Sequence, residues 1–82
     1  MISVYILGKV GTGDELEVLD TFRDTAQVRK ASLTYGTYDL CLETLFETME
    51  ELDDFLFNVV RKTPGITDTV TLVAAKTISK DS

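Results

Sequence analysis

The stretch LCLETLFETMEELDDFLFNVV, residues 40–60, decides the fold because it contains a complete strand-to-helix unit. Its first part, from Leu40 to Phe46, is apolar and typical of a strand. Thr48-Met49-Glu50-Glu51 then fits the capping box that begins a helix, Ser/Thr-x-x-Glu. The apolar residues that follow at helical spacing are Met49, Leu52, Phe55, Leu56, Val59 and Val60. We therefore expect a strand and then an amphipathic helix, which Pro64-Gly65 ends.

The same unit occurs earlier in the chain. Residues 2–10 (ISVYILGKV) are typical of a strand, and Thr12-Gly13-Asp14-Glu15 fits a capping box. Leu16, Leu19 and Phe22 then recur at spacing three, which predicts a helix of about 11 residues. A further strand is expected after each helix, over 28–35 and 66–78.

The resulting order, β-α-β-β-α-β, is that of the ferredoxin-like α+β fold. Right-handed crossovers place both helices on one face of a four-stranded antiparallel sheet. The strands are apolar on both sides, since Val4 and Ile6 alternate with Tyr5 and Leu7. Strands of this kind require burial on both faces. We therefore expect the open face to pack on a second copy, giving a dimeric α/β sandwich.

Length and composition limit the possible functions. A chain of 82 residues forms one domain, which we place at residues 1–78 with a polar tail at 79–82. Its net charge is −6 and it has no basic run, so direct binding to nucleic acid is not expected. No apolar run approaches the ~20 residues that span a bilayer. With one unpaired cysteine and no signal peptide, a cytoplasmic protein without membrane contact is expected.

The sequence shows no recognisable constellation of catalytic residues. There is no histidine, and Gly11-Thr12-Gly13 lacks the Gly-Lys-Ser/Thr ending of a phosphate loop. Asp39 and Glu43 are about 13 Å apart along a strand, too far to share a substrate bond. Cys41 has no basic neighbour that lowers its pKa. We therefore expect no enzyme, no cofactor and no metal site.

Binding remains, and the turn TYGTYDL (residues 34–40) is its best candidate. Gly36 adopts a positive φ without steric cost, so it marks the chain reversal. Hydroxyls, a carboxylate and free backbone groups occur here and in the strand around Thr69 to Thr71. Such groups suit a small zwitterion.

These motifs resemble those of the Lrp/AsnC family's effector domain, also called the RAM domain. Residues 36–40 (GTYDL) are similar to its G-x-Y-D-L turn, and Pro64-Gly65-Ile66 to its P-G-V. Residues 69–72 (TVTL) are similar to its T-x-T strand, and YILGKV (residues 5–10) also fits. Together the motifs extend over about residues 2–75, in the family's order and spacing.

The resemblance implies a stand-alone form, since full-length members carry a helix-turn-helix domain before this one. It also implies dimers that assemble into rings, often octamers, and an amino acid bound between neighbouring dimers. By this resemblance Asp39 faces the ligand's ammonium group or orients the turn. Tyr35, directly before Gly36, is bulkier than the family pattern leads us to expect, and we expect it to narrow or partly fill the pocket. The residues carried over to the binding site are Gly36, Tyr38, Asp39, Thr69 and Thr71.

The leading hypothesis is an amino-acid-binding and oligomerisation module that modulates transcription or amino-acid metabolism. It would act through partners such as full-length Lrp/AsnC-type regulators. Two alternatives stay open at this stage. One is a small dimeric α/β-barrel enzyme of the monooxygenase kind, which shares the element order. The other is a structural assembly protein with no ligand.

Overall fold

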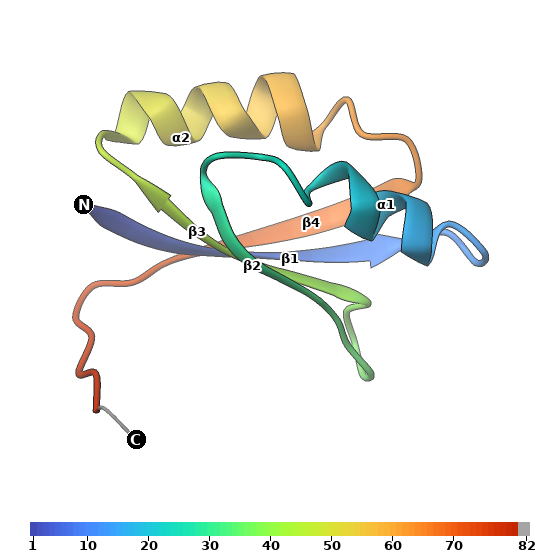
Figure 1. The fold of residues 1–82 in the computed structure, drawn as a ribbon, viewed down its shortest axis with the longest axis horizontal. Coiled ribbons are helices and arrows are strands. Elements are labelled where there is room, and N and C mark those ends of the chain that lie inside the picture. The colour runs from blue at the N-terminus through green and yellow to red at the C-terminus, as the bar shows by residue number, and fades with distance from the viewer. Residues whose placement is uncertain (81–82) are drawn as a thin grey trace.

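The structure of the protein, a computed structural model, describes residues 1–80 and has the predicted order of elements (Figure 1). The predicted tail at 79–82 lies partly outside these residues. Helix α2 continues without a break into a π-helical turn, η1. The elements are β1 (Ile2–Val10), α1 (Glu15–Thr21), β2 (Val28–Leu33), β3 (Leu40–Phe46), α2 (Met49–Phe55), η1 (Leu56–Val60) and β4 (Ile66–Val73).

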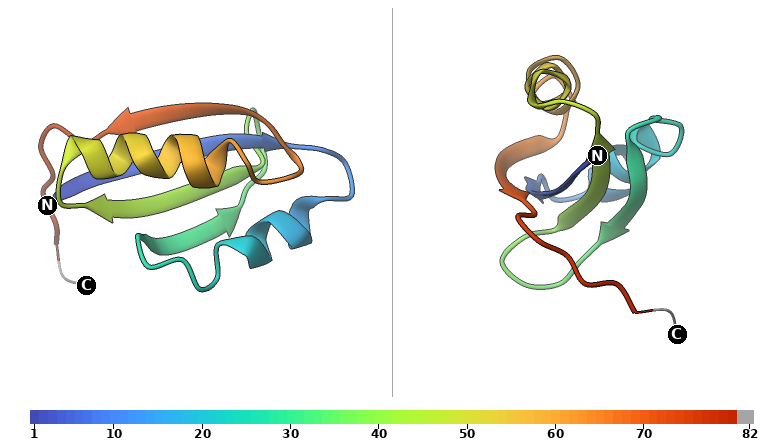
Figure 2. Two further views of the ribbon diagram at one scale, coloured as in Figure 1. Left: turned by 90° about the horizontal axis from the view of Figure 1, so that it is seen from above. Right: turned by 90° about the vertical axis from the view of Figure 1, so that its left-hand side faces the viewer.

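The four strands form one antiparallel sheet in the order β2-β3-β1-β4. Both helices cover the same face, as Figure 2 shows from above and from one end. In the register, Ile6 of β1 lies between Leu42 of β3 and Thr71 of β4. The predicted ferredoxin-like fold is therefore confirmed.

The hydrophobic core lies between the helices and this covered face. Phe55 of α2 contacts Phe46 of β3 and Phe22, with ring centroids 5.3 and 6.4 Å apart. The other buried apolar side chains are Val4, Ile6, Val10, Val18, Leu40, Leu42, Leu52 and Val60.

The start of α2 follows the predicted capping box. The Thr48 hydroxyl accepts a hydrogen bond from the backbone N–H of Glu51, at 3.1 Å. The Glu51 carboxylate accepts from the N–H of Glu47, one residue before the cap, at 2.9 Å. Leu52 and Phe55 are buried as predicted, but Met49 is 50% exposed. Met49 is the first residue of α2 and is not covered by the core. The prediction that it lies on the core face was therefore wrong.

Helix α1 differs more from its prediction. It has 7 residues rather than about 11, and its N-cap is Asp14, which makes no side-chain capping bond. Thr12 is therefore not a cap; instead the Glu15 carboxylate accepts from Gly13 N–H at 3.0 Å. Leu16 is 74% exposed, whereas Val18 and Phe22 are buried. An α-helix has 3.6 residues per turn, so residues spaced by three, such as Leu16, Leu19 and Phe22, rotate progressively away from one face. Val18 and Phe22 are spaced by four and stay closer to a single face, the one that is buried.

Two strands end earlier than predicted. β4 stops at Val73 instead of Ile78, because its only neighbour, β1, begins at Ile2, and the last bond joins Ala74 N–H to Ser3 O. β2 stops at Leu33 instead of Tyr35, because Thr34 already belongs to the turn.

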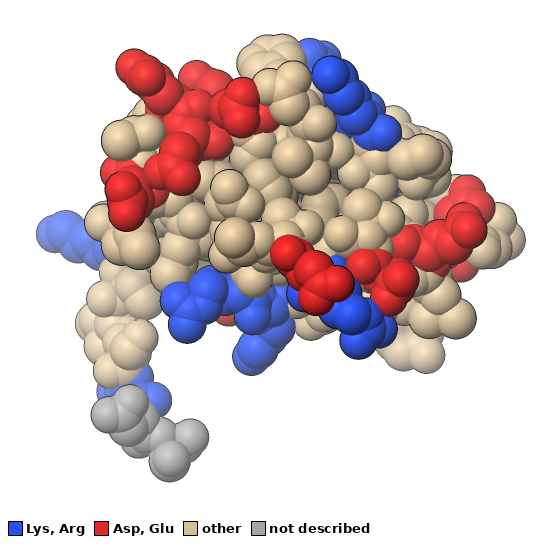
Figure 3. Space-filling view, turned by 45° about the horizontal axis from the view of Figure 1, so that its top comes forward, with Lys and Arg blue, Asp and Glu red and all other residues tan. Residues whose placement is uncertain are grey.

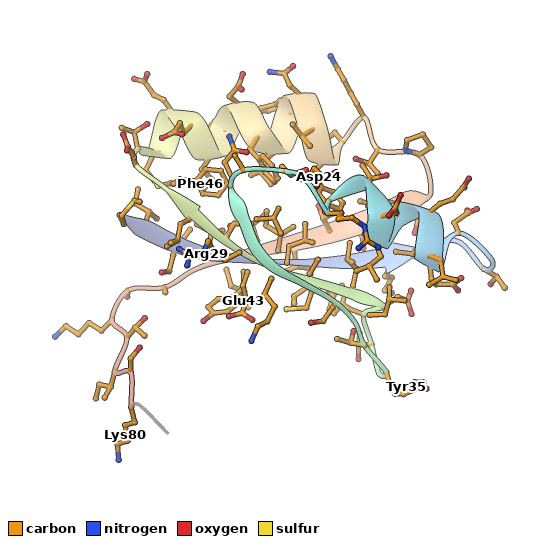
Figure 4. All side chains as sticks on the ribbon, viewed as in Figure 1. Asp24, Arg29, Tyr35, Glu43, Phe46 and Lys80 are labelled. Carbon is orange, nitrogen blue, oxygen red and sulfur yellow. The ribbon has the colours of Figure 1, made fainter. Side chains whose placement is uncertain are left out.

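The face of the sheet away from the helices is largely apolar and has no cover within the protomer. Leu7 of β1 lies opposite Cys41 and Val70, and Tyr5 lies opposite Leu72. None of these five side chains is fully buried. Figure 4 shows Glu43 pointing to this side of the sheet. We call the surface formed by Tyr5, Leu7, Cys41, Leu45, Val70 and Leu72 the open face.

Candidate functional site

The hairpin between β2 and β3 is built around Gly36. Its φ of +117° lies in the region that favours glycine. Two bonds close the turn: Thr34 N–H donates to Asp39 O at 2.9 Å, and the Thr34 hydroxyl donates to Tyr38 O at 2.7 Å. Nothing lies within 4 Å of the place where a Cβ of residue 36 would be. The glycine is therefore required by backbone conformation, while the space around it is free for a ligand or a neighbouring chain.

Asp39 connects this hairpin to β1. Its Oδ2 accepts a hydrogen bond from Val10 N–H at 2.9 Å, and its own N–H donates to Gly8 O at 2.9 Å. The register of β1 against β4 shifts between Lys9 and Val10. The carboxylate therefore holds the hairpin against an irregular part of β1.

The two tyrosines of the turn have different environments. Tyr38 is partly buried, and the Lys9 ammonium lies 5.9 Å from the centroid of its ring. Tyr35 is fully exposed and points away from the tip of the hairpin (Figure 4). Within one protomer its side chain borders the pocket beside the hairpin but stays fully exposed to solvent.

A shallow pocket of about 350 Å³ lies beside the hairpin. Glu15, from the first turn of α1, lines it together with Asp39 and Tyr35. Sequence reasoning did not assign Glu15 to the site. It is 24 positions from Asp39 in the chain (39 − 15), and only the packing of α1 brings the two carboxylates to one pocket.

Thr69 and Thr71 lie elsewhere, on the helix-covered side of β4. They line a second groove, of about 210 Å³, beneath η1. The five predicted site residues therefore form two groups in one protomer. Gly36, Tyr38 and Asp39 belong to the hairpin, and the two threonines belong to the groove. Arg61 also lines this groove and was not predicted there, although it follows Phe57 at the helical spacing of four.

Cys41 is a free, partly buried cysteine. Burial raises its pKa, and the charge of Glu43 raises it further.

Gly11 serves a tight turn, because its N–H donates to Gly65 O at 2.9 Å and a Cβ would come within 2.8 Å of the Asp14 carboxylate. Across residues 1–80, no three His, Cys, Asp or Glu side chains gather as metal ligands. None of the helices in this range has the length and hydropathy of a membrane-spanning segment.

Comparison with known families gives a match over residues 4–82 to the model described as "Lrp/AsnC ligand binding domain". The chain belongs to the Lrp/AsnC ligand-binding domain family. The predicted resemblance is therefore confirmed. The domain is the regulatory, ligand-binding part of transcription regulators, so membership makes the enzyme alternative less well supported. A search of curated proteins gave no match.

Solved structures agree with this assignment. FFRP-DM1 is 34% identical, with a TM-score of 0.87 over 90% of this Lrp/AsnC chain and 99% of its own. The hypothetical protein PHS023 from Pyrococcus horikoshii is 32% identical, with a TM-score of 0.87. The match covers 94% of this chain and 93% of PHS023.

A longer regulator shares the fold. NMB0573 from Neisseria meningitidis, a transcriptional regulator solved as an L-Met complex, is 18% identical, with a TM-score of 0.87. The match covers 96% of this Lrp/AsnC chain and 53% of the regulator, so the chain spans about half the regulator's length.

Proposed function

We propose that this protein is an amino-acid-binding and oligomerisation module that modulates transcription or amino-acid metabolism through partners. The observation that carries the proposal is the family match, which covers residues 4–82 with a ligand-binding domain. The related fold of NMB0573, solved with L-Met, supports an amino acid as the ligand. Catalysis forms no part of the proposed role.

The open face supports the oligomeric part of the proposal. It presents Leu7, Val70 and Leu72 without cover from the protomer. Burial of apolar area stabilises by roughly 25 cal/mol per Å², so covering this face with a second copy would contribute substantially. In this proposal dimers form through the open faces, and the helix-covered sides remain on the outside.

The split of the candidate residues supports a site between neighbouring copies. In one protomer the hairpin pocket at Asp39 and the groove at Thr69 and Thr71 have no lining residue in common. A ligand that contacts both needs the hairpin of one copy and the groove of another. The amino acid then lies between dimers and adds to the contacts that hold them together.

Because the net charge of the chain is −6, it is poorly suited to contact the DNA phosphates, and we propose that a partner makes the contact with DNA. Full-length Lrp/AsnC regulators, which share the domain, are the proposed partners in mixed assemblies. In this role the module reports amino-acid levels by changing which assemblies form.

The test is a screen of the twenty L-amino acids by thermal shift, followed by calorimetric titration. A ligand that binds only the folded protein stabilises it by about 1.4 kcal/mol at ten times its Kd. For a domain of this size, each kcal/mol of stabilisation raises the melting temperature by roughly 4–8 °C. One or a few amino acids are expected to respond. If none shifts the melting temperature at millimolar concentration, the sensing role is wrong.

A further inference from the structure

The groove between η1 and β4 has an apolar wall and a polar floor. Leu56 and Val60 line it from the helix side, with Phe57 and Arg61 at its rim. Thr69 and Thr71 line it from the strand. No acidic side chain lines this groove. Arg61 is therefore the only charged residue that lines the groove.

The Arg61 guanidinium is held in a defined position. Its carbon Cζ lies 4.9 Å from the centroid of the Phe57 ring, a stacking distance for a cation over an aromatic face. In the part of the chain that the structure describes, the only ion pair joins Arg23 to Asp20. Arg61 is thus exposed, oriented by Phe57 and free to bind an external anion.

Phe57 itself is 57% exposed, although its neighbour Phe55 is fully buried in the core. An exposed aromatic ring beside an apolar groove offers further contact area to an apolar ligand. Together Phe57 and Arg61 give the groove both a surface for carbon and a donor for oxygen.

The two candidate pockets have opposite charge. The hairpin pocket has the carboxylates of Glu15 and Asp39, while the groove has Arg61. On the surface of helix α2, Figure 3 shows a further division of charge, with Asp and Glu gathered over its start and Lys and Arg near its other end, the end that carries Arg61. An α-amino acid has a cation and an anion on adjacent atoms. Its orientation between two such surfaces is therefore set by charge.

We propose that the groove binds the α-carboxylate of an amino acid with an apolar side chain, with Arg61 as the charged donor. Thr69 and Thr71 add hydroxyl donors, and Leu56, Phe57 and Val60 contact the side chain. The ammonium group points to the hairpin carboxylates of a neighbouring copy. Lysine and arginine are poor ligands, because the groove offers no carboxylate to their side chains and Arg61 repels them. This inference rests on the proposed amino-acid-binding function and specifies the ligand class.

Paired ligands test the role of Arg61. L-Leucine, L-isoleucine, L-valine, L-methionine and L-phenylalanine are each titrated into the assembled protein, and so are their amides. A mildly acidic pH keeps the amine of each amide protonated. A charge-assisted hydrogen bond supports about a tenfold difference in Kd, so each amide is expected to bind about tenfold more weakly than its acid.

The variant Arg61→Gln removes the charge and leaves a shorter, neutral polar side chain. It is expected to weaken the acids about tenfold and to leave the amides unchanged, so the ratio of acid to amide affinity falls to about one. Lys62→Gln is the matched control. Lys62 is the adjacent exposed cation but does not line the groove, so the ratio should stay as in the original protein.

Phe57→Ala tests the orienting role of the ring. It is expected to weaken the apolar amino acids and to reduce the acid-to-amide ratio, since the guanidinium loses its support. A loss of contact area alone would weaken acids and amides equally and would remove Phe57 from the proposal.

The outcomes separate this inference from the proposed function. If amino acids bind but Arg61→Gln weakens acid and amide equally, the carboxylate is bound elsewhere and the assignment is wrong. If lysine or arginine binds as tightly as leucine, the proposed specificity is wrong while the sensing role stands. If no amino acid binds the original protein, both the inference and the function fail.

Discussion

At the scale of single residues, Asp39 combines a structural contact with a proposed binding role. One carboxylate oxygen, Oδ2, accepts from Val10 N–H. The motif that contains Asp39 therefore has a structural explanation that does not depend on a ligand. The two roles are separable, because an amide can accept the same hydrogen bond without the charge.

We predict that Asp39→Asn keeps the melting temperature within a few degrees but abolishes the response to amino acids. Asp39→Ala should also lose the bond to Val10 and destabilise the fold by about 1 kcal/mol or more. Thermal melting with and without ligand measures both effects. If Asp39→Asn responds to amino acids like the original protein, the charge of Asp39 has no part in binding.

Cys41 gives a prediction about pH. Burial, and secondarily Glu43, raise the pKa of this thiol in the folded state. Its contribution to stability is therefore complete below the pKa of the unfolded thiol, about 8.5, and is lost as the pH rises through the folded value. Alkylation by iodoacetamide at mildly alkaline pH should be slow in the native protein and fast in denaturant.

Glu43→Gln is the informative comparison for this thiol, because it removes the charge but leaves the burial. It should increase the native alkylation rate modestly and leave the rate in denaturant unchanged. Equal native and denatured rates in the original protein would show that the thiol is not protected.

At the scale of elements, the two helix starts show that one sequence pattern has two outcomes. Thr48 caps α2 through Glu51 N–H, whereas Thr12 has the same spacing to Glu15 and does not cap α1. The difference lies in the backbone, because the residues between Thr12 and α1 form a turn with Gly13 at a positive φ. A capping box describes potential bonds, and the preceding turn decides whether the hydroxyl reaches the helix.

This contrast predicts unequal costs for the same substitution. Thr48→Ala should destabilise the protein by about 1 kcal/mol, the usual cost of losing an N-cap. Thr12→Ala should change the stability by only a few tenths of a kcal/mol, since no capping bond is lost. Denaturant unfolding of both variants at one protein concentration measures the difference. Equal losses would mean that Thr12 caps α1 in solution.

At the scale of the whole molecule, the sheet has one face covered by helices and one open face. The core on the covered side is complete, with aromatic contacts among Phe22, Phe46 and Phe55. A chain of 82 residues buries only about 60–65% of its unfolded surface. Contact between copies through the open face is therefore the proposed source of additional stability.

The prediction at this scale concerns Leu7, near the centre of the open face. Light scattering should find the original protein at least dimeric. Leu7→Glu should dissociate or unfold it, because an unpaired charge in an interface costs several kcal/mol. Leu16→Glu is the control, since this leucine is 74% exposed on α1 and lies on the helix side. A stable folded monomer of the original protein at micromolar concentration would contradict the proposed assembly.

Local patterns were sufficient to predict several features from the sequence alone. The bounds of β1 and β3, the glycine turn at Gly36 and the cap at Thr48 all agree with the structure. Each depends on residues that are neighbours in the chain, through alternation of side chains, backbone preference or a bond across three positions. The order of the strands and helices was then enough to predict the ferredoxin-like fold, whereas the family was inferred from the motifs GTYDL (residues 36–40), PGI (residues 64–66) and TVTL (residues 69–72).

Contacts between distant parts of the chain were decided only by the tertiary structure. The bond from Val10 to Asp39 depends on how the hairpin lies against β1. The place of Glu15 beside the hairpin and the exposure of Leu16 depend on how α1 packs. The groove around Thr69 and Arg61 depends on how η1 lies over β4. No local pattern encodes these pairings, because their free energy comes from surfaces that meet only after the chain has folded.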